Sequence, residues 1–282
     1  MTTTERLVPA CTFHQLARPE PWAAFRRTGL VRVRGAAHPP SVEAAREAGF
    51  EVFRHPELID PACHRGNGET GYTPPGVEGV AGGPVNTRRH FWDIRALSKE
   101  RNRRCAFTRR FVSAMEDVER HMNLAVCQAM HHMDRALPGL GSELYRVILH
   151  GDHGFRATHY PDDAEPAELR FPRHRDRSLF TVFAGGGEPG LQVEIDGAWY
   201  DLENPPGDVV IMAGAMLRYW TGGPAHPDRI RAVAHRVGGV AGERLSLALF
   251  AEPARETVMP NADGLTAGNY LDELVRWTRS KL

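Results

Sequence analysis

Apolar residues recur at helical spacing over residues 104–136, three or four positions apart, until a Pro-Gly pair interrupts the pattern. The apolar positions are Phe107, Phe111, Met115, Val118, Met122, Ala125, Ala129 and Met133. A single apolar stripe on so long a segment predicts a helix that packs against a large partner. His121, His131 and His132 also lie on this segment, but the pair has no carboxylate at ligand spacing on its face. We therefore interpret these histidines as surface or satisfied side chains.

The pattern changes after Gly141 to short apolar or alternating runs separated by turn residues. The candidate strands, in chain order, are ELYRVILH, GFRATHY, RHRDRSLFTVFA, LQVEI, AWYDL, DVVIMAG, MLRYWTG, IRAVAHRV and RLSLALFAE. Many short strands without intervening helices are typical of a β sandwich or barrel. With the helix that precedes them, these runs predict a mainly β core with flanking helices.

The N-terminal part of the chain mixes both patterns. FHQLARPEPWAAFRRTG and SVEAAREAGFEVFRHP predict helices, and LVRVRG between them predicts a short strand. Residues 61–98 are rich in Gly and Pro and predict a long irregular segment. Segments of this length inside a compact protein tend to be functional loops.

Composition narrows the class of protein. The formal net charge is +0, so no overall field attracts nucleic acid or an anionic membrane. No apolar run approaches the roughly 18 residues of a membrane span, and the first residues do not have the pattern of a signal peptide. The cysteines Cys11, Cys63, Cys105 and Cys127 form no CxxC pair, which argues against a zinc knuckle or a disulfide framework. We expect a cytoplasmic protein without a nucleic-acid or membrane partner, and the oligomeric state stays open.

Candidate metal ligands stand in two of the predicted strands. His174 and Asp176 flank Arg175 at the head of one strand, where side-chain alternation would direct both to one face. His235 follows in another strand, after residues 177–234. Two histidines and one carboxylate leave open coordination positions and suit iron(II), whereas the same ligands on zinc would indicate a hydrolase.

A carboxylate-binding pair favours iron over zinc. Arg244 and Ser246 share one face of the last predicted strand, and Leu245, Leu247 and Leu249 share the other. An inward arginine is costly unless it meets an anion, and guanidinium binds carboxylate bidentately. Tyr160 shares a strand face with Arg156 and Thr158. On spacing alone, Tyr160 fits a contact to the bound carboxylate and a tyrosine at the edge of the core equally well.

At this point the sequence resembles a known family, the isopenicillin N synthase-like, 2-oxoglutarate-dependent iron oxygenases, which include cephalosporin expandase-type enzymes. The matching stretches cover about residues 145–252 in the family's order, and they are FRATHYP, HRDRSLFTVFAGGGEPGLQV, GAWYDLENPPGDVVIMAGAMLRYWTGG, AHRV and ERLSLALF. GETGYTPPGVEG and RRHFWDI also look like a long loop of bacterial members.

The resemblance implies a double-stranded β-helix, the jelly-roll or cupin-like core. It implies an Fe(II)/2-oxoglutarate-dependent dioxygenase that uses O2 to hydroxylate, desaturate or cyclise a small molecule, in specialised or antibiotic metabolism. The roles implied are His174, Asp176 and His235 for iron(II), Arg244 and Ser246 for the 5-carboxylate of 2-oxoglutarate, and Tyr160 for a further co-substrate contact, with Arg156 and Thr158 as additional candidates.

Two departures bear on these roles. Plant members of the family have an asparagine where Thr158 stands, so hydrogen bonding to the co-substrate can differ. Residues 1–100 match poorly, and in this fold they supply much of the substrate pocket. We therefore divide the chain into residues 1–100, which contribute to the pocket, and residues 101–282, which form the core, within one integrated domain.

Two other functions fit the same residues. An iron oxidase of this fold would use no 2-oxoglutarate, and Arg244 with Ser246 would then hold a substrate carboxylate. A non-catalytic jelly roll would bind a ligand, but it should lack an intact set of metal ligands. The C-terminal stretch GNYLDELVRWTRSKL predicts an amphipathic helix of about three turns, which is either a lid over the site or a helix packed on the outer sheet.

Overall fold

The structure, a computed structural model, describes residues 7–65, 70–77, 88–95, 102, 104–136, 144–162, 169–227 and 229–279, and for 274–279 it describes the backbone alone. Its elements, in chain order, are β1 (Ala10–Cys11), α2 (Phe13–Leu16), α3 (Pro19–Thr28), β2 (Leu30–Val33), α4 (Pro39–Arg54), the 3-10 turns η1 (Pro56–Leu58) and η2 (Pro61–Cys63), β3 (Gly71–Thr73), β4 (His90–Arg95), α5 (Arg109–Ala136), α6 (Leu144–Leu149), β5 (Gly154–Tyr160), β6 (Phe171–His174), β7 (Phe180–Ala184), β8 (Leu191–Ile195), β9 (Ala198–Asp201), β10 (Val209–Ala213), α7 (Leu217–Trp220), β11 (His235–Val237), β12 (Arg244–Ala251) and α8 (Ala267–Arg279).

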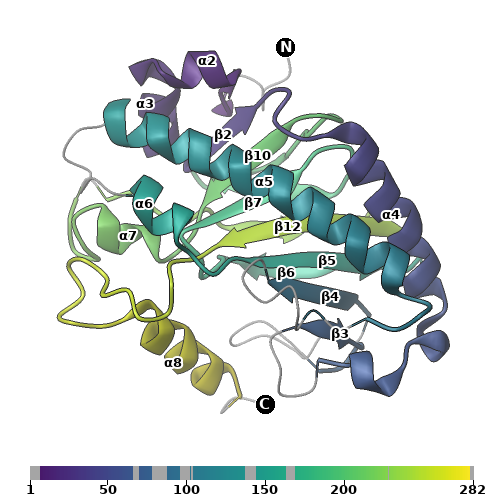
Figure 1. Ribbon diagram of the computed structural model, residues 1–282. Coiled ribbons are helices and arrows are strands. Elements are labelled where there is room, and N and C mark those ends of the chain that lie inside the picture. The colour runs from purple at the N-terminus through teal and green to yellow at the C-terminus, as the bar shows by residue number, and fades with distance from the viewer. Residues whose placement is uncertain are drawn as a thin grey trace.

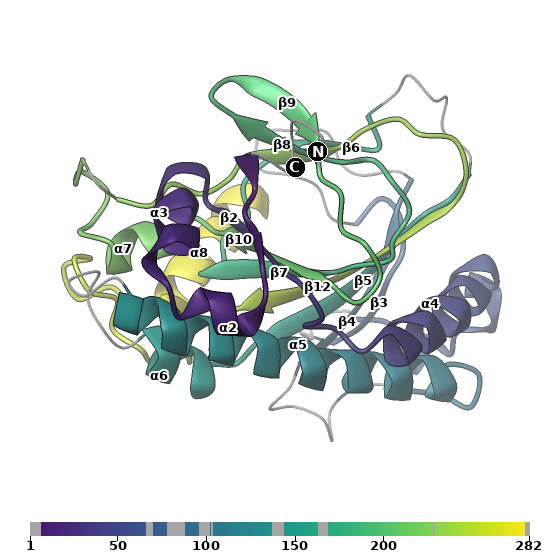
Figure 2. The ribbon, with the colours of Figure 1, turned by 90° about the horizontal axis from the view of Figure 1, so that it is seen from above.

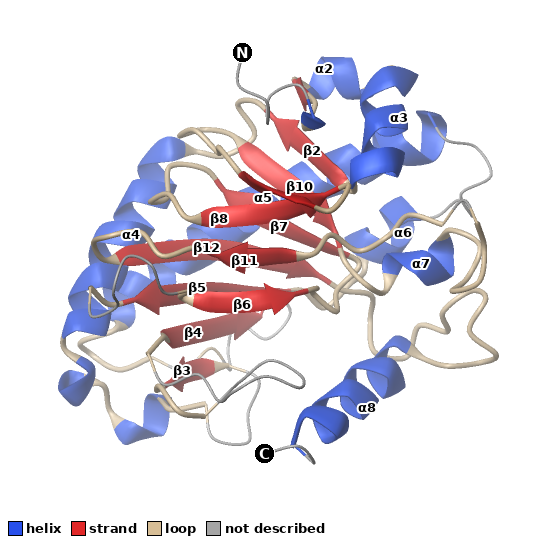
Figure 3. Cartoon of the chain, turned by 180° about the vertical axis from the view of Figure 1, so that it is seen from behind, coloured by secondary structure: helices blue, strands red, loops and turns tan. Residues whose placement is uncertain are grey.

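Three layers make up the fold. An 8-stranded sheet has the strand order β1-β2-β10-β7-β12-β5-β4-β3, and a 4-stranded sheet has the order β6-β11-β8-β9. Helix α5 crosses one face of the large sheet beside α4 (Figure 1). The small sheet covers the opposite face (Figures 2 and 3). The two facing sheets and their flanking helices confirm the predicted mainly β, jelly-roll architecture.

Side-chain alternation along β12 separates the helix side of the large sheet from the inner side. Leu245, Leu247 and Leu249 are buried on the helix side, as predicted. Helix α4 approaches this surface closely at Gly49, where an added Cβ would lie 2.7 Å from Leu245 Cδ2 and 3.0 Å from the Phe111 ring of α5. The alternate residues Arg244 and Ser246 are therefore left on the side that faces the small sheet.

The predicted helices at SVEAAREAGFEVFRHP and over residues 104–136 are confirmed as α4 and α5, and LVRVRG contains β2. Two predicted strands are wrong. ELYRVILH forms α6, in which Leu144 and Ile148, four residues apart, are both buried. MLRYWTG forms α7, where Leu217 and Trp220 are buried. Both runs are too short for periodicity alone to separate a helix from a strand.

The Gly- and Pro-rich segment is more regular than predicted. Strand β4 pairs with β5 over six residues, and β3 adds to the edge of β4. Phe91 and Asp93 alternate with Trp92 and Ile94 along β4, so this strand carries the period of two expected of a strand. Strands β1 to β4 from the first 100 residues therefore belong to the same sheet as β5, β7, β10 and β12.

Within the described residues, no helix is long and apolar enough to cross a membrane.

Candidate metal centre and carboxylate-binding row

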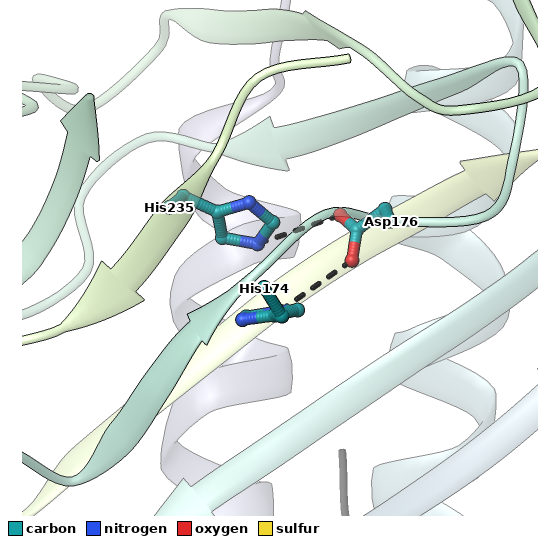
Figure 4. A group of neighbouring side chains, drawn as sticks. All are labelled: His174, Asp176 and His235. Carbon is teal, nitrogen blue, oxygen red and sulfur yellow. Dashed lines mark ion pairs between the residues drawn. The ribbon is translucent and has the colours of Figure 1, made fainter. Parts of the chain in front are cut away.

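His174, Asp176 and His235 meet between the two sheets. His174 ends β6 and His235 begins β11, and they are register partners of this antiparallel pair, with ring centroids 4.0 Å apart. The Nε2 atoms of His174 and His235 each lie 3.6 Å from a different carboxylate oxygen of Asp176. One donor atom from each residue falls within 4.8 Å of the others. Figure 4 shows the three side chains converging on one point.

The route by which Asp176 reaches this point differs from the predicted one. Strand β6 stops at His174, so Asp176 lies in the connection to β7 and not one pleat further along a strand. Its backbone oxygen accepts a hydrogen bond from Ala215 N at 2.8 Å. The Thr181 hydroxyl donates to Asp176 Oδ2 at 2.5 Å. One contact therefore fixes the backbone of Asp176 and the other fixes its carboxylate, and strand alternation plays no part.

Both imidazoles direct Nδ1 to a backbone carbonyl and Nε2 to the centre of the site. His174 Nδ1 lies 2.9 Å from Pro172 O, and His235 Nδ1 lies 3.4 Å from Val233 O. A ring that donates from Nδ1 to a backbone carbonyl keeps the lone pair on Nε2, the usual arrangement of a metal-binding histidine. These Nε2 atoms are the ones that face Asp176.

The charge states suit a divalent metal. Burial, helped by the neighbouring His235, lowers the pKa of His174 to about 4. Burial alone would raise the pKa of Asp176, but the two imidazoles and the Thr181 hydroxyl outweigh it, so the pKa falls below its usual range. At neutral pH the site thus offers a neutral His174 and a carboxylate. Two imidazole nitrogens and one carboxylate on one side of a centre fit iron(II) with open positions.

A second group of predicted residues lines adjacent strands of the large sheet. Strands β12 and β5 pair so that Arg244 lies opposite Tyr160, Ser246 opposite Thr158, and Ala248 opposite Arg156. Register partners point to the same face, so all of these side chains face the small sheet. The structure therefore brings the predicted carboxylate-binding residues into one row.

Arg244 has unused hydrogen-bonding capacity. It is 4% exposed, its Nε donates to Pro189 O at 3.3 Å, and its guanidinium carbon lies 5.3 Å from the centre of the Tyr160 ring. Among the described residues, no acceptor reaches its buried Nη1. Burial lowers the pKa of Arg244 because it disfavours the charged form. A cavity of about 490 Å³ adjoins Arg244 and Ser246 and includes Phe183 and the 185–190 loop.

Arg156 has a protein carboxylate as its partner. Its Nε and Nη2 donate to the two oxygens of Asp93 at 2.7 and 2.9 Å. Thr158 lies in the row beside Ser246 and is buried. The geometry thus places Thr158, more than Arg156, among candidates for a ligand contact, and both roles stay predictions.

Sequence reasoning missed Thr181 and Asp93. Thr181 lies on β7, five residues after Asp176, in a run that the sequence marks only as a strand. Thr181 and Phe183 are two residues apart on one strand, so they share the face that points towards the small sheet. This alternation was the sequence signal that could have identified Thr181 as a residue near the site. Asp93 could have been identified because it is the charged residue in the largely apolar stretch HFWDI.

Comparisons with known proteins agree with this geometry. Residues 151–253 match the model of the 2OG-Fe(II) oxygenase superfamily. Mugineic-acid 3-dioxygenase of Hordeum vulgare is 36% identical over 108 residues, which are 38% of this chain and 30% of that protein. Isopenicillin N synthase of Streptomyces griseus is 33% identical over 129 residues, 42% of this chain and 38% of that one. The chain thus matches about a third of the length of these relatives.

Solved structures resemble the whole fold. A full-length Neurospora crassa protein in complex with alpha-KG superposes with a TM-score of 0.76 and 19% identity, over 95% of this chain and 96% of that one. A structure from Caulobacter crescentus described as a 2OG-Fe(II) oxygenase family protein gives a TM-score of 0.75 at 20% identity, over 95% and 98% of the two chains. At these identities the likeness establishes the fold.

Proposed function

Because residues 151–253 match the model of the 2OG-Fe(II) oxygenase superfamily, we propose that this protein is an iron(II)- and 2-oxoglutarate-dependent dioxygenase that oxidises a small molecule. One observation carries the proposal. The His174–Asp176–His235 cluster, in which His235 is buried and the other two residues are partly buried, lies between the same two sheets as Arg244. Arg244 is a buried arginine whose Nη1 has no acceptor among the described residues. A metal-binding face and a carboxylate-binding residue are the two parts that such an enzyme needs.

The residues divide the work between them. Iron(II) held by the three ligands would supply, with 2-oxoglutarate and O2, the oxidising power to cleave an unreactive C–H bond. Arg244 and Ser246 would bind the 5-carboxylate of 2-oxoglutarate, with Tyr160 beside them. The Thr181 hydroxyl, which donates a hydrogen bond to Asp176, would hold this carboxylate towards the metal.

Anaerobic titration tests the proposal. Wild-type protein given iron(II) and then 2-oxoglutarate should develop a weak visible charge-transfer band, and admission of O2 should yield succinate. His174→Ala, Asp176→Ala and His235→Ala should each lose the band and the bound iron. His150→Ala, which removes an exposed histidine, is the matched control and should keep both. If two of the ligand variants bound iron and turned over normally, this assignment of the metal ligands would be wrong.

A second candidate is an iron oxidase that uses no 2-oxoglutarate. The likeness to isopenicillin N synthase favours it, and Arg244 would then bind a substrate carboxylate. The two candidates differ in the titration, because an oxidase would show neither the 2-oxoglutarate band nor succinate.

The finer assignments are proposals as well. A place in specialised or antibiotic metabolism rests on the likeness to isopenicillin N synthase, while mugineic-acid 3-dioxygenase and other plant enzymes match equally short segments. A small-molecule substrate agrees with the superfamily, and a cytoplasmic location stays a proposal.

A further inference from the structure

Arg170, the residue before β6, has a buried and unsatisfied guanidinium. Its side chain is 2% exposed. None of its three guanidinium nitrogens has a hydrogen-bond partner in the described part of the chain. One carboxylate oxygen there approaches it, Asp162 Oδ1 at 4.0 Å, which is beyond hydrogen-bonding distance. That oxygen already accepts a hydrogen bond from Gly242 N at 2.8 Å.

Such a side chain is unfavourable in the protein alone. A buried charge is strongly penalised unless an opposite charge and hydrogen bonds compensate it. A hydrophobic or neutral residue would fill the same space without this penalty. The arginine is therefore best explained by an anion that enters the site and supplies the missing acceptors.

The position of Arg170 relates it to Arg244. Arg170 N donates to Val237 O at 3.0 Å, and Val237 packs with Phe171 and Tyr160. Tyr160 in turn lies opposite Arg244 and beneath its guanidinium. Arg244 thus lies over the Tyr160 ring, and the backbone of Arg170 is joined to the same cluster through Val237.

The electrostatics of this region also favour an anion. Burial is the main reason that the pKa of Arg244 is lowered, and the positive charges of Arg46 and Arg170 lower it further. Arg46 is compensated by its ion pair with Glu188, as Arg156 is by Asp93. Arg170 and Arg244 both keep nitrogens without acceptors in the described residues. A carboxylate shared by the two would relieve their repulsion and satisfy both.

We propose that Arg170 is a second carboxylate-binding arginine, which grips the distal carboxylate of 2-oxoglutarate together with Arg244. This inference rests on the proposed function and extends it to a residue outside the Arg244–Ser246 pair. The ligand class is a dicarboxylate whose far end meets two guanidiniums. The 2-oxo acid end is left for the metal.

Calorimetric titration under anaerobic conditions tests this role directly. Iron(II)-loaded wild type, Arg170→Gln, Arg244→Gln and Arg173→Gln would each be titrated with 2-oxoglutarate. Each would also be titrated with 2-oxovalerate, which has the same chain length but lacks the distal carboxylate. Arg173→Gln is the matched control, because it removes a nearby arginine, on β6, whose partner is Glu194 and whose side chain is 47% exposed.

Arg170→Gln should weaken 2-oxoglutarate binding about 10- to 100-fold, while its affinity for 2-oxovalerate stays within about twofold of wild type. Arg244→Gln should show the same selective loss, and Arg173→Gln should show none. Without ligand, Arg170→Gln should melt at or above the wild-type temperature, because it removes an uncompensated buried charge. The thermal shift produced by 2-oxoglutarate should be smaller than in wild type.

Two results would overturn the role of Arg170. One is unchanged 2-oxoglutarate affinity in Arg170→Gln beside a loss in Arg244→Gln. The other is a lower melting temperature with equal weakening of both 2-oxo acids, which would indicate a structural arginine. A wild-type protein that binds iron(II) but not 2-oxoglutarate would instead overturn the proposed function, and this inference with it.

Discussion

The Thr181 hydroxyl orients one of the three proposed metal ligands. It donates to Asp176 Oδ2 at 2.5 Å, and Asp176 has no regular strand to hold it. Thr181→Val keeps the shape of the side chain but removes the donor. Residues that hydrogen-bond to metal ligands typically change metal affinity about 10- to 100-fold. We therefore expect Thr181→Val to bind iron(II) about 10-fold more weakly than wild type, as measured by anaerobic calorimetry.

Thr181→Ser, which restores the hydroxyl, should recover most of that affinity. Equal iron(II) binding by the valine and serine variants would show that the hydrogen bond to Asp176 does not matter to the metal.

Arg244 should determine affinity for 2-oxoglutarate more than it determines folding. Loss of a charge-assisted bidentate pair costs roughly 2–4 kcal/mol, which is about 30- to 1000-fold in binding of 2-oxoglutarate by Arg244→Ala. Arg244→Lys should lose less but stay impaired, because an ammonium cannot reproduce the two parallel hydrogen bonds of guanidinium. Titration of iron(II)-loaded variants measures this, and an unchanged 2-oxoglutarate affinity in Arg244→Ala would favour the oxidase.

The candidate site could be predicted from sequence where residues share a strand. Arg244 and Ser246 were placed on one face by alternation alone, and the structure agrees. His174 and His235 converge because β6 pairs with β11. Side-chain alternation within a strand does not predict which strands pair, so here the prediction came from the family resemblance. Thr181 was missed because its contact with Asp176 depends on the path of the β6–β7 connection, a property of tertiary structure.

Short elements show the same limit of local patterns. In α6 and α7, few residues separate the buried positions, so a helix and a strand fit equally well. The 28 residues of α5 give a repeated signal, and that helix was predicted from its spacing. Strand β4 was not predicted because it lies in a Gly- and Pro-rich segment and is paired with the distant strand β5, which local patterns do not indicate.

His153 ties α6 to the end of β12 and makes this contact sensitive to pH. Its Nε2 donates to Ile148 O at 2.9 Å, and its Nδ1 accepts from Glu252 N at 3.1 Å. Burial lowers the pKa of His153 to about 4. The unfolded chain therefore binds a proton that the folded chain does not, and stability falls as the pH decreases from about 6.5 towards 4.

From this residue we expect a loss of about 2 kcal/mol in unfolding free energy between pH 7 and pH 5. Urea unfolding at both pH values measures the loss. His153→Gln has no group that titrates in this range, so its stability should depend less on pH than that of wild type. Parallel losses in the two proteins would assign the pH dependence to other groups.

Helix α8 is anchored by its first turn. Ala267, Tyr270 and Leu271 are buried, and the centre of the Tyr270 ring lies 5.7 Å from that of Tyr219 on α7. Arg255 forms an ion pair with Asp272 at 2.7 Å. Of the residues behind the lid hypothesis, Leu274, Val275, Trp277 and Thr278 have side chains outside the described part.

Deletion from Asn269 onward should lower the melting temperature, because it removes Tyr270 and Leu271 from the core. A shorter deletion from Leu274 onward keeps this anchor. If the removed part of α8 is a lid, the shorter deletion should form more succinate per molecule of oxidised product, with an unchanged melting temperature. If the longer deletion left the melting temperature unchanged, the first turn would not be part of the core.

On the scale of the whole molecule, the division at residue 100 does not coincide with a boundary in the large sheet. Strand β4 pairs with β5, and β2 pairs with β10. Residues 101–282 alone would expose both of these edges, so we expect this fragment to lack a cooperative thermal transition and near-UV circular dichroism, whereas the full chain should unfold in one transition. A fragment that melts cooperatively would show that two separate domains exist.

The pairing of β2 with β10 also has a consequence for synthesis. Val33 and Val209 are register partners, so β2 leaves the ribosome long before the strand that will cover its edge. At ~5–20 residues per second, it waits on the order of ten seconds or more. During that time Leu30, Val31 and Val33, all buried in the finished protein, are available to other chains. Yield in the cell should therefore depend on chaperones that bind the nascent N-terminal segment.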